Sequence, residues 1–447
     1  MNRSLARIWE AGSVWVAVLL LGLAAAAQPE TNSPARAGSV EDTPGRLSLA
    51  DAQRIAMERN WDLLATATGV DAATAQKIVA REFPNPTLAA SSSKIKVDNQ
   101  PSSAAAGNGI WDRSYDTIFA INQLLEIGGK RGSRKASAQA GFEGAKAQFF
   151  DAKRTLDLAI TKAYVGAVQA EENVRVLKQS AATLRKEAQL AEVRRKAGEI
   201  SDSDESQIQI TAEKFELDAG TAESAAAQAR ITLEVLLAVR RPRGEVVLSD
   251  GLEKLGTEVP ATETSPSGFG RPDVMAAEAA LRRAEAELRL QKANRIPDPT
   301  LLAHYEHEPP DAFNTVGIGV SFPLPLWNRN RGNILAAEAA REQARLVFEK
   351  IQTQAAADIA AARFAYEDAA RRWQSYRESI RPRSEQIRKT MAYAYQKGGA
   401  SLLDLLVAER NDNDVRLAAA QAAGDTAVAV AALKAATLVI QPSQIKK

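Results

Sequence analysis

The sequence predicts a mainly α-helical protein with a small β part, built from long coiled-coil helical hairpins and four strands. Three observations lead to this fold class. The first is a run of 65 residues without glycine, from Asn333 to Lys397, rich in Ala, Glu, Arg and Gln. The second is a pair of short alternating segments in each half of the chain. The third is that the whole order of elements recurs about 200 residues later, which indicates an internal duplication.

The segment 333–397, if it is helical throughout, extends roughly 100 Å, far longer than a globular domain needs. Its apolar or small positions recur in steps of three and four, the spacing of a coiled-coil seam. They are Ile359, Ala362, Tyr366, Ala369, Trp373, Tyr376 and Ile380, followed by Ile387 and Ala394. The helix therefore needs partner helices. Pro382 lacks a backbone N–H and crowds the preceding turn, so we expect a kink or a short break there.

The composition excludes several classes of function. The 447 residues carry 57 Lys and Arg against 55 Asp and Glu, so the charge gives no global reason to expect nucleic acid. The absence of cysteine excludes disulfides, thiolate metal sites, a cysteine nucleophile and a lipidated N-terminal cysteine. Two histidines leave little material for acid–base chemistry near neutral pH. No Ser/His/Asp set, carboxylate pair or glycine fingerprint emerges, so we expect neither an enzyme nor a cofactor.

Residues 1–27 have the pattern of a secretory signal peptide. Two arginines precede an apolar core at 14–23, and the small residues 24–27 suit a cleavage site. We expect the mature chain to begin near Gln28. The segment 28–46, with three prolines and few apolar residues, is predicted to be a mobile N-terminus.

The first repeat is predicted over 47–240. It opens with a helix over 47–82 that Pro84 and Pro86 stop. Two segments of membrane-spanning strand length follow, 87–98 and 114–124, joined by a long loop. In the second of these, alternate positions share one face, namely Tyr115, Thr117, Phe119 and Ile121. After Gly128-Gly129 a helical hairpin is predicted, with a long helix over 133–197 and a second helix over 201–239.

The second repeat, 272–438, has the same order after a linker or equatorial segment at 241–271. Its strands are predicted at 300–306 and 314–322, and a tail at 439–447 ends the chain. Specific residues match at a constant offset of 200. They are Arg131-Gly132 with Arg331-Gly332, Gly198 with Gly398, Ser201 with Ser401, and Asp204 with Asp404.

Four membrane-length strands cannot close a barrel, and an open edge in lipid leaves backbone groups unpaired. Other chains must therefore pair with the edges, and three protomers would supply twelve strands, an even number within the range of outer-membrane barrels. The long helices carry charges throughout, so they must project into an aqueous compartment. We accordingly expect a homotrimer, with Tyr115, Phe119 and Ile121 on the lipid face together with Val316, Ile318 and Val320.

These features resemble the outer-membrane factor (TolC-like) channels of Gram-negative efflux and secretion systems, over nearly the whole mature chain. The resemblance rests on the duplication and on motifs such as Pro84-Asn85-Pro86-Thr87, Pro297-Asp298-Pro299-Thr300 and Arg271-Pro272-Asp273-Val274, and on Gly398 to Leu406 at the helical turn. Two further segments are similar to the CzcC-like heavy-metal efflux branch, Glu126-Ile127-Gly128-Gly129-Lys130-Arg131 and the segment Pro323 to Gly332. The resemblance implies a trimeric β-barrel with an α-helical tunnel (α-barrel), in the outer membrane, joined by a periplasmic adaptor to an inner-membrane pump of the resistance–nodulation–division (RND) type.

Three groups of candidate site residues follow. The turns at Gly198–Ser201 and Gly398–Ser401 lie farthest from the strands and are predicted to dock the adaptor. Asp404 and Asp204 each follow the serine by three residues, a capping-box-like spacing. In the resembling family an aspartate at the position of Asp404 lines the constricted tunnel end, which implies a channel aperture; Val407 replaces a second aspartate expected one turn later. A membrane interface is predicted at Lys130, Arg131, Trp327, Arg329 and Arg331.

His304 and His307 do not form a predicted metal site, because residues three apart in a strand point to opposite faces. The sequence leaves the cargo open between heavy-metal cations, drugs and secreted polypeptides. A function from a different class, a secreted coiled-coil adhesin or structural protein, would explain the helices but not the four alternating strands or the duplicated Pro-x-Pro boundaries.

Overall fold

The computed structural model describes residues 46–93, 116–256, 270–308, 312–441 and 443–444. The predicted signal peptide 1–27, the segment 28–45, the loop between the first two strands, and Tyr115 lie outside the described residues. The described part is mainly helical with one small antiparallel sheet, as the sequence predicts.

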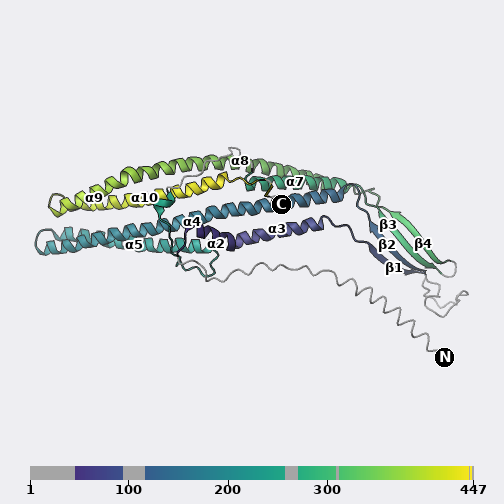
Figure 1. The fold of residues 1–447 in the computed structure, drawn as a ribbon, viewed down its shortest axis with the longest axis horizontal. Helices are drawn as coiled ribbons and strands as arrows, with labels where there is room; N and C mark the ends of the chain where they lie inside the picture. The colour runs from purple at the N-terminus through teal and green to yellow at the C-terminus, as the bar shows by residue number, and fades with distance from the viewer. Residues whose placement is uncertain (1–45, 94–115, 257–269, 309–311, 442, 445–447) are drawn as a thin grey trace, which may run out of the picture. The chain divides into compact units, whose positions relative to one another are not determined.

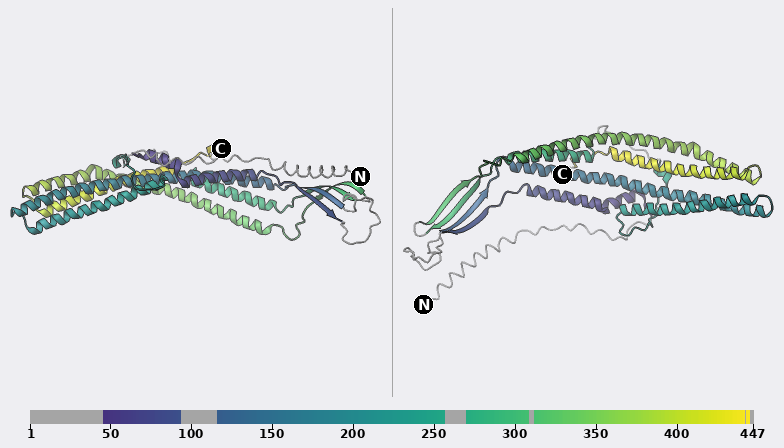
Figure 2. Two further views of the ribbon diagram at one scale, coloured as in Figure 1. Left: turned by 90° about the horizontal axis from the view of Figure 1, so that it is seen from below. Right: turned by 180° about the vertical axis from the view of Figure 1, so that it is seen from behind.

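The helices form two hairpins that lie side by side, with the sheet at the end opposite their tips (Figure 1). The long α4 (Lys130–Lys196) packs against α3 (Trp61–Val79) and α7 (Pro272–Ala293), and α7 packs against α8 (Arg331–Ser375). Farther from the sheet, α4 packs against α5 (Asp202–Leu236) and α10 (Leu402–Thr437), and α10 packs against α9 (Arg381–Gln396). Figure 2 shows this arrangement of neighbouring helices from two further sides.

The four strands pair in chain order, β1-β2-β3-β4, and all are antiparallel. They are β1 (Thr87–Ser93), β2 (Asp116–Leu124), β3 (Thr300–Glu308) and β4 (Ala312–Ser321). Residues 94–98 and 114–115 of the predicted strands lie outside the described residues. In the second repeat, β3 runs two residues farther than predicted, and β4 begins earlier and ends before Phe322.

The helix predicted over 47–82 is wrong as a single element, because it breaks at Asn60 into α2 (Leu49–Arg59) and α3. Asn60 has extended backbone angles and caps α3, its side-chain oxygen accepting from the N–H groups of Asp62 and Leu63 at 3.1 Å. Asparagine is among the favoured N-cap residues for this reason. Its Nδ2 also donates to the Leu236 carbonyl at 3.0 Å, which ties the break to α5.

The interruption expected at Pro382 is present as a π-helical turn, Tyr376–Ile380, directly before α9. Within one chain, the predicted seam is buried only before the turn. Ile359, Ala369 and Trp373 are buried as predicted, but Ile380 and Ile387 are 39% and 55% exposed. A π turn inserts one extra residue and so rotates the buried face of the helix. After the turn, Tyr395 is buried rather than the adjacent Ala394.

The linker at 241–256 folds back onto the helices instead of separating the repeats. Leu47 forms a β-bridge with Leu248, and α6 (Leu252–Gly256) adds Leu252 and Leu255 to the main core. The buried carboxylate of Glu234 accepts four backbone N–H bonds from residues 243–246, at 2.6 to 3.2 Å. These bonds fix the turn that leaves α5.

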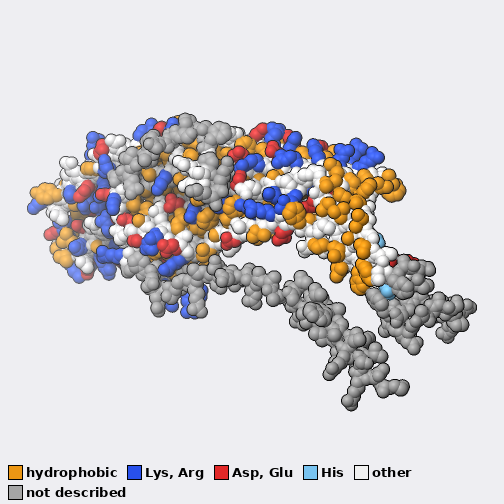
Figure 3. Space-filling model, turned by 45° about the vertical axis from the view of Figure 1, so that its right-hand side comes forward, with side chains coloured by type: hydrophobic (Ala, Val, Ile, Leu, Met, Phe, Trp, Pro, Cys, Tyr) orange, Lys and Arg blue, Asp and Glu red, His pale blue; other side chains and the backbone are white. Residues whose placement is uncertain are grey.

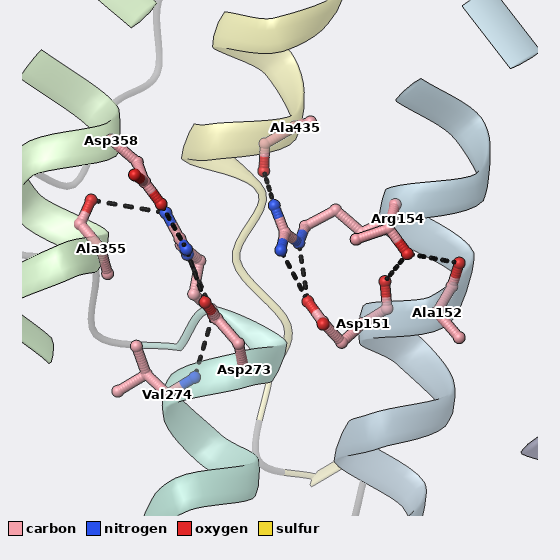
Figure 4. Close-up of polar contacts among 10 residues, drawn as sticks. Asp151, Ala152, Arg154, Asp273, Val274, Ala355, Asp358 and Ala435 are labelled. Atoms are coloured by element: carbon pink, nitrogen blue, oxygen red, sulfur yellow. Dashed lines mark hydrogen bonds and ion pairs between the residues drawn. The ribbon is translucent and has the colours of Figure 1, made fainter. Parts of the chain in front are cut away.

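Two arginines join neighbouring helices near the start of α7, and one of them links the two repeats (Figure 4). Arg271 is 3% exposed, and its guanidinium contacts Asp273 and, at 3.1 Å, Asp358 of α8. Arg154 of α4 pairs with Asp151 at 2.7 Å and donates to the Ala435 carbonyl at the end of α10.

Among the described residues, no helix is long and apolar enough to span a membrane.

Candidate channel aperture, docking tip and membrane interface

The two hairpin tips have the same backbone geometry. Gly198 and Gly398 both have φ of +78°, a left-handed conformation that glycine adopts without a steric penalty. At the first tip the N–H of Gly198 donates to the Arg195 carbonyl at 2.9 Å, and at the second the N–H of Gly398 donates to the Tyr395 carbonyl at 3.1 Å. The next N–H in each tip reaches one residue farther back, which completes a matched pair of helix C-caps.

The helices that leave the tips also begin alike, with one difference. Ser201 and Ser401 accept from the N–H groups of Asp204 and Asp404, at 3.1 and 3.2 Å. Only Asp404 completes the capping box, because its Oδ2 accepts from the Ser401 N–H at 3.1 Å and from the Ser401 hydroxyl at 2.7 Å. These hydrogen bonds from Ser401 hold the pKa of the exposed Asp404 carboxyl below its ordinary value. The Asp404 carboxylate therefore caps α10 while it stays exposed at the tip.

Three residues that the sequence did not single out join one tip to the other. The guanidinium of Arg194 lies 5.5 Å from the centre of the Tyr395 ring, and its Nη2 approaches the Gln396 carbonyl at 3.4 Å. None of these three residues belongs to a motif that the sequence analysis identified. The signal that could have indicated the contact is a tyrosine three residues before the closing glycine of only one hairpin.

The predicted membrane interface divides into two parts. Lys130 was expected at the surface, but it is only 7% exposed, because its Nζ pairs with Asp298 at 2.8 Å and donates to the Ile296 carbonyl at 2.6 Å. Arg131 donates to the Arg81 carbonyl and lies 4.0 Å from the centre of the Phe83 ring. These two cations join the start of α4 to the segments that lead into the sheet.

Trp327, by contrast, is 93% exposed, and Arg329 and Arg331 close to it in the chain are exposed as well. Figure 3 shows hydrophobic side chains gathered over the sheet and Lys and Arg side chains on the neighbouring helix ends. The placement of Trp327, Arg329 and Arg331 is compatible with an interface, which stays a prediction.

One face of the sheet carries continuous rows of apolar side chains. The register places Ile121 of β2, Ala303 of β3 and Ile318 of β4 in one row, and Phe119, Tyr305 and Val316 in the next. Ile318 and Val316 are 89% and 80% exposed. The opposite face carries small and polar residues, including Asn122, Glu306, Gly317, Gly319 and Thr315.

The two histidines lie on opposite faces of β3. His304 covers Gly317, where an added Cβ would lie 2.2 Å from the imidazole, whereas His307 approaches Asn314. Over the described ranges, no group of three or more His, Cys, Asp or Glu side chains is arranged to hold a metal ion.

The doubled helical hairpins, the amphipathic sheet and the matched tips together define the class of fold to which the chain belongs. The chain belongs to the outer membrane efflux protein family, whose profile matches residues 53–239 and 270–437. Among curated relatives it is similar to the cobalt-zinc-cadmium resistance protein CzcC of Cupriavidus metallidurans, with 25% identity over 86% of this chain and 88% of that protein. It is also similar to the cation efflux system protein CusC of Escherichia coli K12, with 31% identity over 41% of this chain and 42% of CusC.

Solved structures share the fold. The outer membrane protein VceC of Vibrio cholerae has a TM-score of 0.72 at 21% identity, over 87% of this chain and 95% of that chain. A structure of CusC has a TM-score of 0.72 at 18% identity, over 92% of this chain and 98% of that chain. The predicted fold class and family are confirmed, whereas the trimer and its closed barrel are not seen in a single chain and stay predictions.

Proposed function

We propose that this chain is the outer-membrane channel component of a tripartite efflux system and forms a passive exit duct for heavy-metal cations. In this proposal the energy is supplied by an inner-membrane RND pump, and a periplasmic adaptor joins the pump to the hairpin tips. The chain contributes a path and an aperture rather than catalysis, and it needs no cofactor.

The observation that carries the proposal is the sheet. Its order leaves β1 and β4 each paired on one side only within the described residues, and one face is lined by aliphatic side chains that are largely exposed. In water such a face and two open edges would favour aggregation. In a membrane, strands from two further copies would pair with both edges, and lipid would cover the apolar face.

The helices support the same assembly. Large apolar side chains are exposed on α3, α5, α8 and α9. They include Trp61, Ile78, Ile210, Leu217, Leu346, Phe364 and Ile387. Contact with neighbouring protomers would bury these side chains and close the helices into a tunnel.

The assignment of metal cations as the cargo rests on the relatives and on the aperture. Two of the relatives described above are a cobalt-zinc-cadmium resistance protein and a cation efflux protein. Asp404 lies at the hairpin tip and is exposed, so a trimer would place three carboxylates around one axis. Such a ring favours cations, since close like charges are relieved by counter-ions.

Growth of a deletion strain on a panel of metal salts and drugs tests the cargo. We expect sensitivity to divalent heavy-metal cations that the intact gene reverses, without a change for drugs. Sensitivity to drugs alone would instead favour the alternative of a drug-efflux channel, and a defect in polypeptide export would favour a secretion channel. Recovery of the chain from the soluble extracellular fraction would favour the adhesin class.

Assembly and docking are tested separately. We expect detergent-extracted protein to be trimeric by light scattering, and a monomer would contradict the barrel. Cysteines placed at Ile200 and Ala400 should cross-link to an adaptor in cells. Labelling of the same positions by a reagent confined to the cell exterior would reverse the proposed orientation.

A further inference from the structure

Two buried carboxylates meet an arginine between α9 and α10, and a third carboxylate lies near them on α4. Glu409 and Asp412 of α10 are 5% and 2% exposed, and Arg388 of α9 lies against both. Arg388 Nη1 donates to Glu409 Oε1 at 3.3 Å, whereas its Nε is 3.2 Å from Asp412 Oδ2 without forming a hydrogen bond. Glu187 of α4 is close enough to Glu409 to act on it electrostatically.

Two carboxylate oxygens of the cluster lack a hydrogen-bond donor. Arg416 is a second cation beside Asp412, 3.5 Å from its Oδ2. Asp412 Oδ1 and Glu187 Oε2 are both buried and have no hydrogen-bond partner in the described structure. Buried polar oxygens are almost always paired, so each unpaired one indicates a missing proton, water or ion.

Other charges at the rim face the same groups. Arg194 acts on Glu187 from the same helix and opposes the rise in its pKa. Glu385 of α9 pairs with Lys389 at 2.7 Å and also interacts electrostatically with Arg388 and Arg416. On α4, Ser180 and Gln179 contact Asn413 and Arg416 of α10.

The duplication shows that helix packing does not require these charges. At the offset of 200, the first hairpin has Ala188, Gln209 and Ala212 where the second has Arg388, Glu409 and Asp412. Ala212 is 5% exposed, so an alanine fills the matched core position. Of the two hairpins, only the second has ionisable residues at these three positions, and two of them are buried, which indicates a role beyond stability.

Protonation is the simplest way to relieve the cluster. Burial raises the pKa of the Glu409 carboxyl, and Asp412 and Glu187 add to the rise while Arg388 opposes it. Burial also raises the pKa of Glu187. A raised pKa in the folded state means that these groups stabilise the packing below their ordinary value of 4.5, and that this stabilisation is lost as the pH rises through the folded pKa.

We propose that Glu187 and Glu409, packed near the buried Asp412, form a proton-dependent lock, which holds the α9/α10 hairpin against α4 when they are protonated and loosens it when they are ionised. The lock rests on the proposed channel function. Asp404, the proposed aperture residue, lies in the first turn of α10, so a loosened α10 would also free the aperture. Acidification would narrow the duct, and a neutral periplasm would leave it easier to open.

The thermal midpoint of the purified trimer, measured between pH 5 and pH 8, tests the lock. We expect the double variant E187Q/E409Q to raise the midpoint at pH 8 by about 2 °C or more and to flatten its decline with pH. The control is Glu213→Gln, which removes one carboxylate charge from an exposed position on α5 and should leave the slope unchanged. A double variant with the wild-type slope would overturn the proposal.

Conductance of the same proteins in planar bilayers tests the consequence for the duct. The wild-type channel should conduct less at pH 5 than at pH 8, and the double variant should lose this difference. A pH-dependent conductance that the double variant keeps would contradict the lock. Protein that never conducts would count against the channel function itself, whereas the thermal slope would still decide whether the carboxylates are linked to protons.

Discussion

The guanidinium of Arg194 lies 5.5 Å from the centre of the Tyr395 ring, and this contact joins the last turn of α4 to the last turn of α9. The duplication does not reproduce it, because Ala394 matches Arg194 and Arg195 matches Tyr395. The contact is therefore a link between the tips that the duplication does not repeat. Tyr395 is buried and the Arg194 side chain is 23% exposed, so the ring and the cation are both partly shielded from water.

We expect Arg194→Ala to loosen the tips. A cation over an aromatic ring contributes about 0.5–2 kcal/mol, depending on its exposure. A double-mutant cycle with Tyr395→Leu should therefore give a coupling of about 1 kcal/mol in thermal unfolding. Single-channel conductance should rise in either single variant. Arg185→Ala is the control, because the exposed Arg185 pairs with the exposed Glu216 within one hairpin and so does not join the two tips. Additive effects of Arg194→Ala and Tyr395→Leu would show that no link exists.

Asp404 is predicted to act both as a cap and as an aperture residue. Purified channels should be cation-selective and blocked by multivalent cations from the periplasmic side. Asp404→Ala should weaken the block, and Asp204→Ala should weaken it less. Because the pKa of Asp404 is lowered, its contribution to stability is present above the ordinary value of 3.8 and is lost as the pH falls through the lowered pKa. The stability difference between wild type and Asp404→Ala should thus disappear in strong acid.

Ser401→Ala separates the two roles of Asp404. It removes the hydroxyl that caps α10 and should cost about 1 kcal/mol of stability, but it keeps the carboxylate. Block and selectivity should therefore persist in Ser401→Ala. Should Asp404→Ala lower stability yet leave block and selectivity unchanged, the residue is a cap alone and the aperture lies elsewhere.

The sequence was sufficient for the elements that depend on local patterns. Left-handed glycines at 198 and 398, the serine caps and the alternation in β2 and β4 are all determined within a few residues. Phe119 and Val316, predicted to share a face, share a row in the observed register through Tyr305.

Features that depend on residues distant in sequence could not be read in the same way. The basic residue Lys130 looked like a surface cation, but Asp298 and the Ile296 carbonyl, more than 160 residues away, enclose it. The apolar spacing predicts a seam that continues past Pro382. The π turn just before that proline shifts the face that is buried within the chain, so that Tyr395 is buried instead. The contact between Arg194 and Tyr395 requires knowing how the two hairpins lie against each other.

The apolar face of the sheet gives a further prediction. Phe119→Arg and Ile318→Arg should each cost roughly 2–4 kcal/mol if the positions lie near mid-bilayer, and trimer assembly in membranes should fall accordingly. Asn122→Arg, on the opposite face of β2, places the same charge where the lumen is proposed and should be tolerated. Assembly that is insensitive to Phe119→Arg and Ile318→Arg would contradict the barrel.

The pair of Lys130 and Asp298 gives the last prediction, which concerns how the sheet is held on the helices. Lys130→Met leaves Asp298, whose side chain is 17% exposed, without its cation and should cost roughly 3 kcal/mol. Asp298→Asn alone should also destabilise, since it leaves the buried ammonium without a counter-charge. The double variant Lys130→Met/Asp298→Asn should recover much of the loss, because it removes both charges and keeps a side-chain oxygen near the Ile127 N–H, which Asp298 Oδ1 accepts at 2.9 Å. Thermal unfolding of the four proteins measures the coupling. Wild-type stability in Lys130→Met, combined with weaker binding to anionic lipid vesicles, would return Lys130 to the membrane interface.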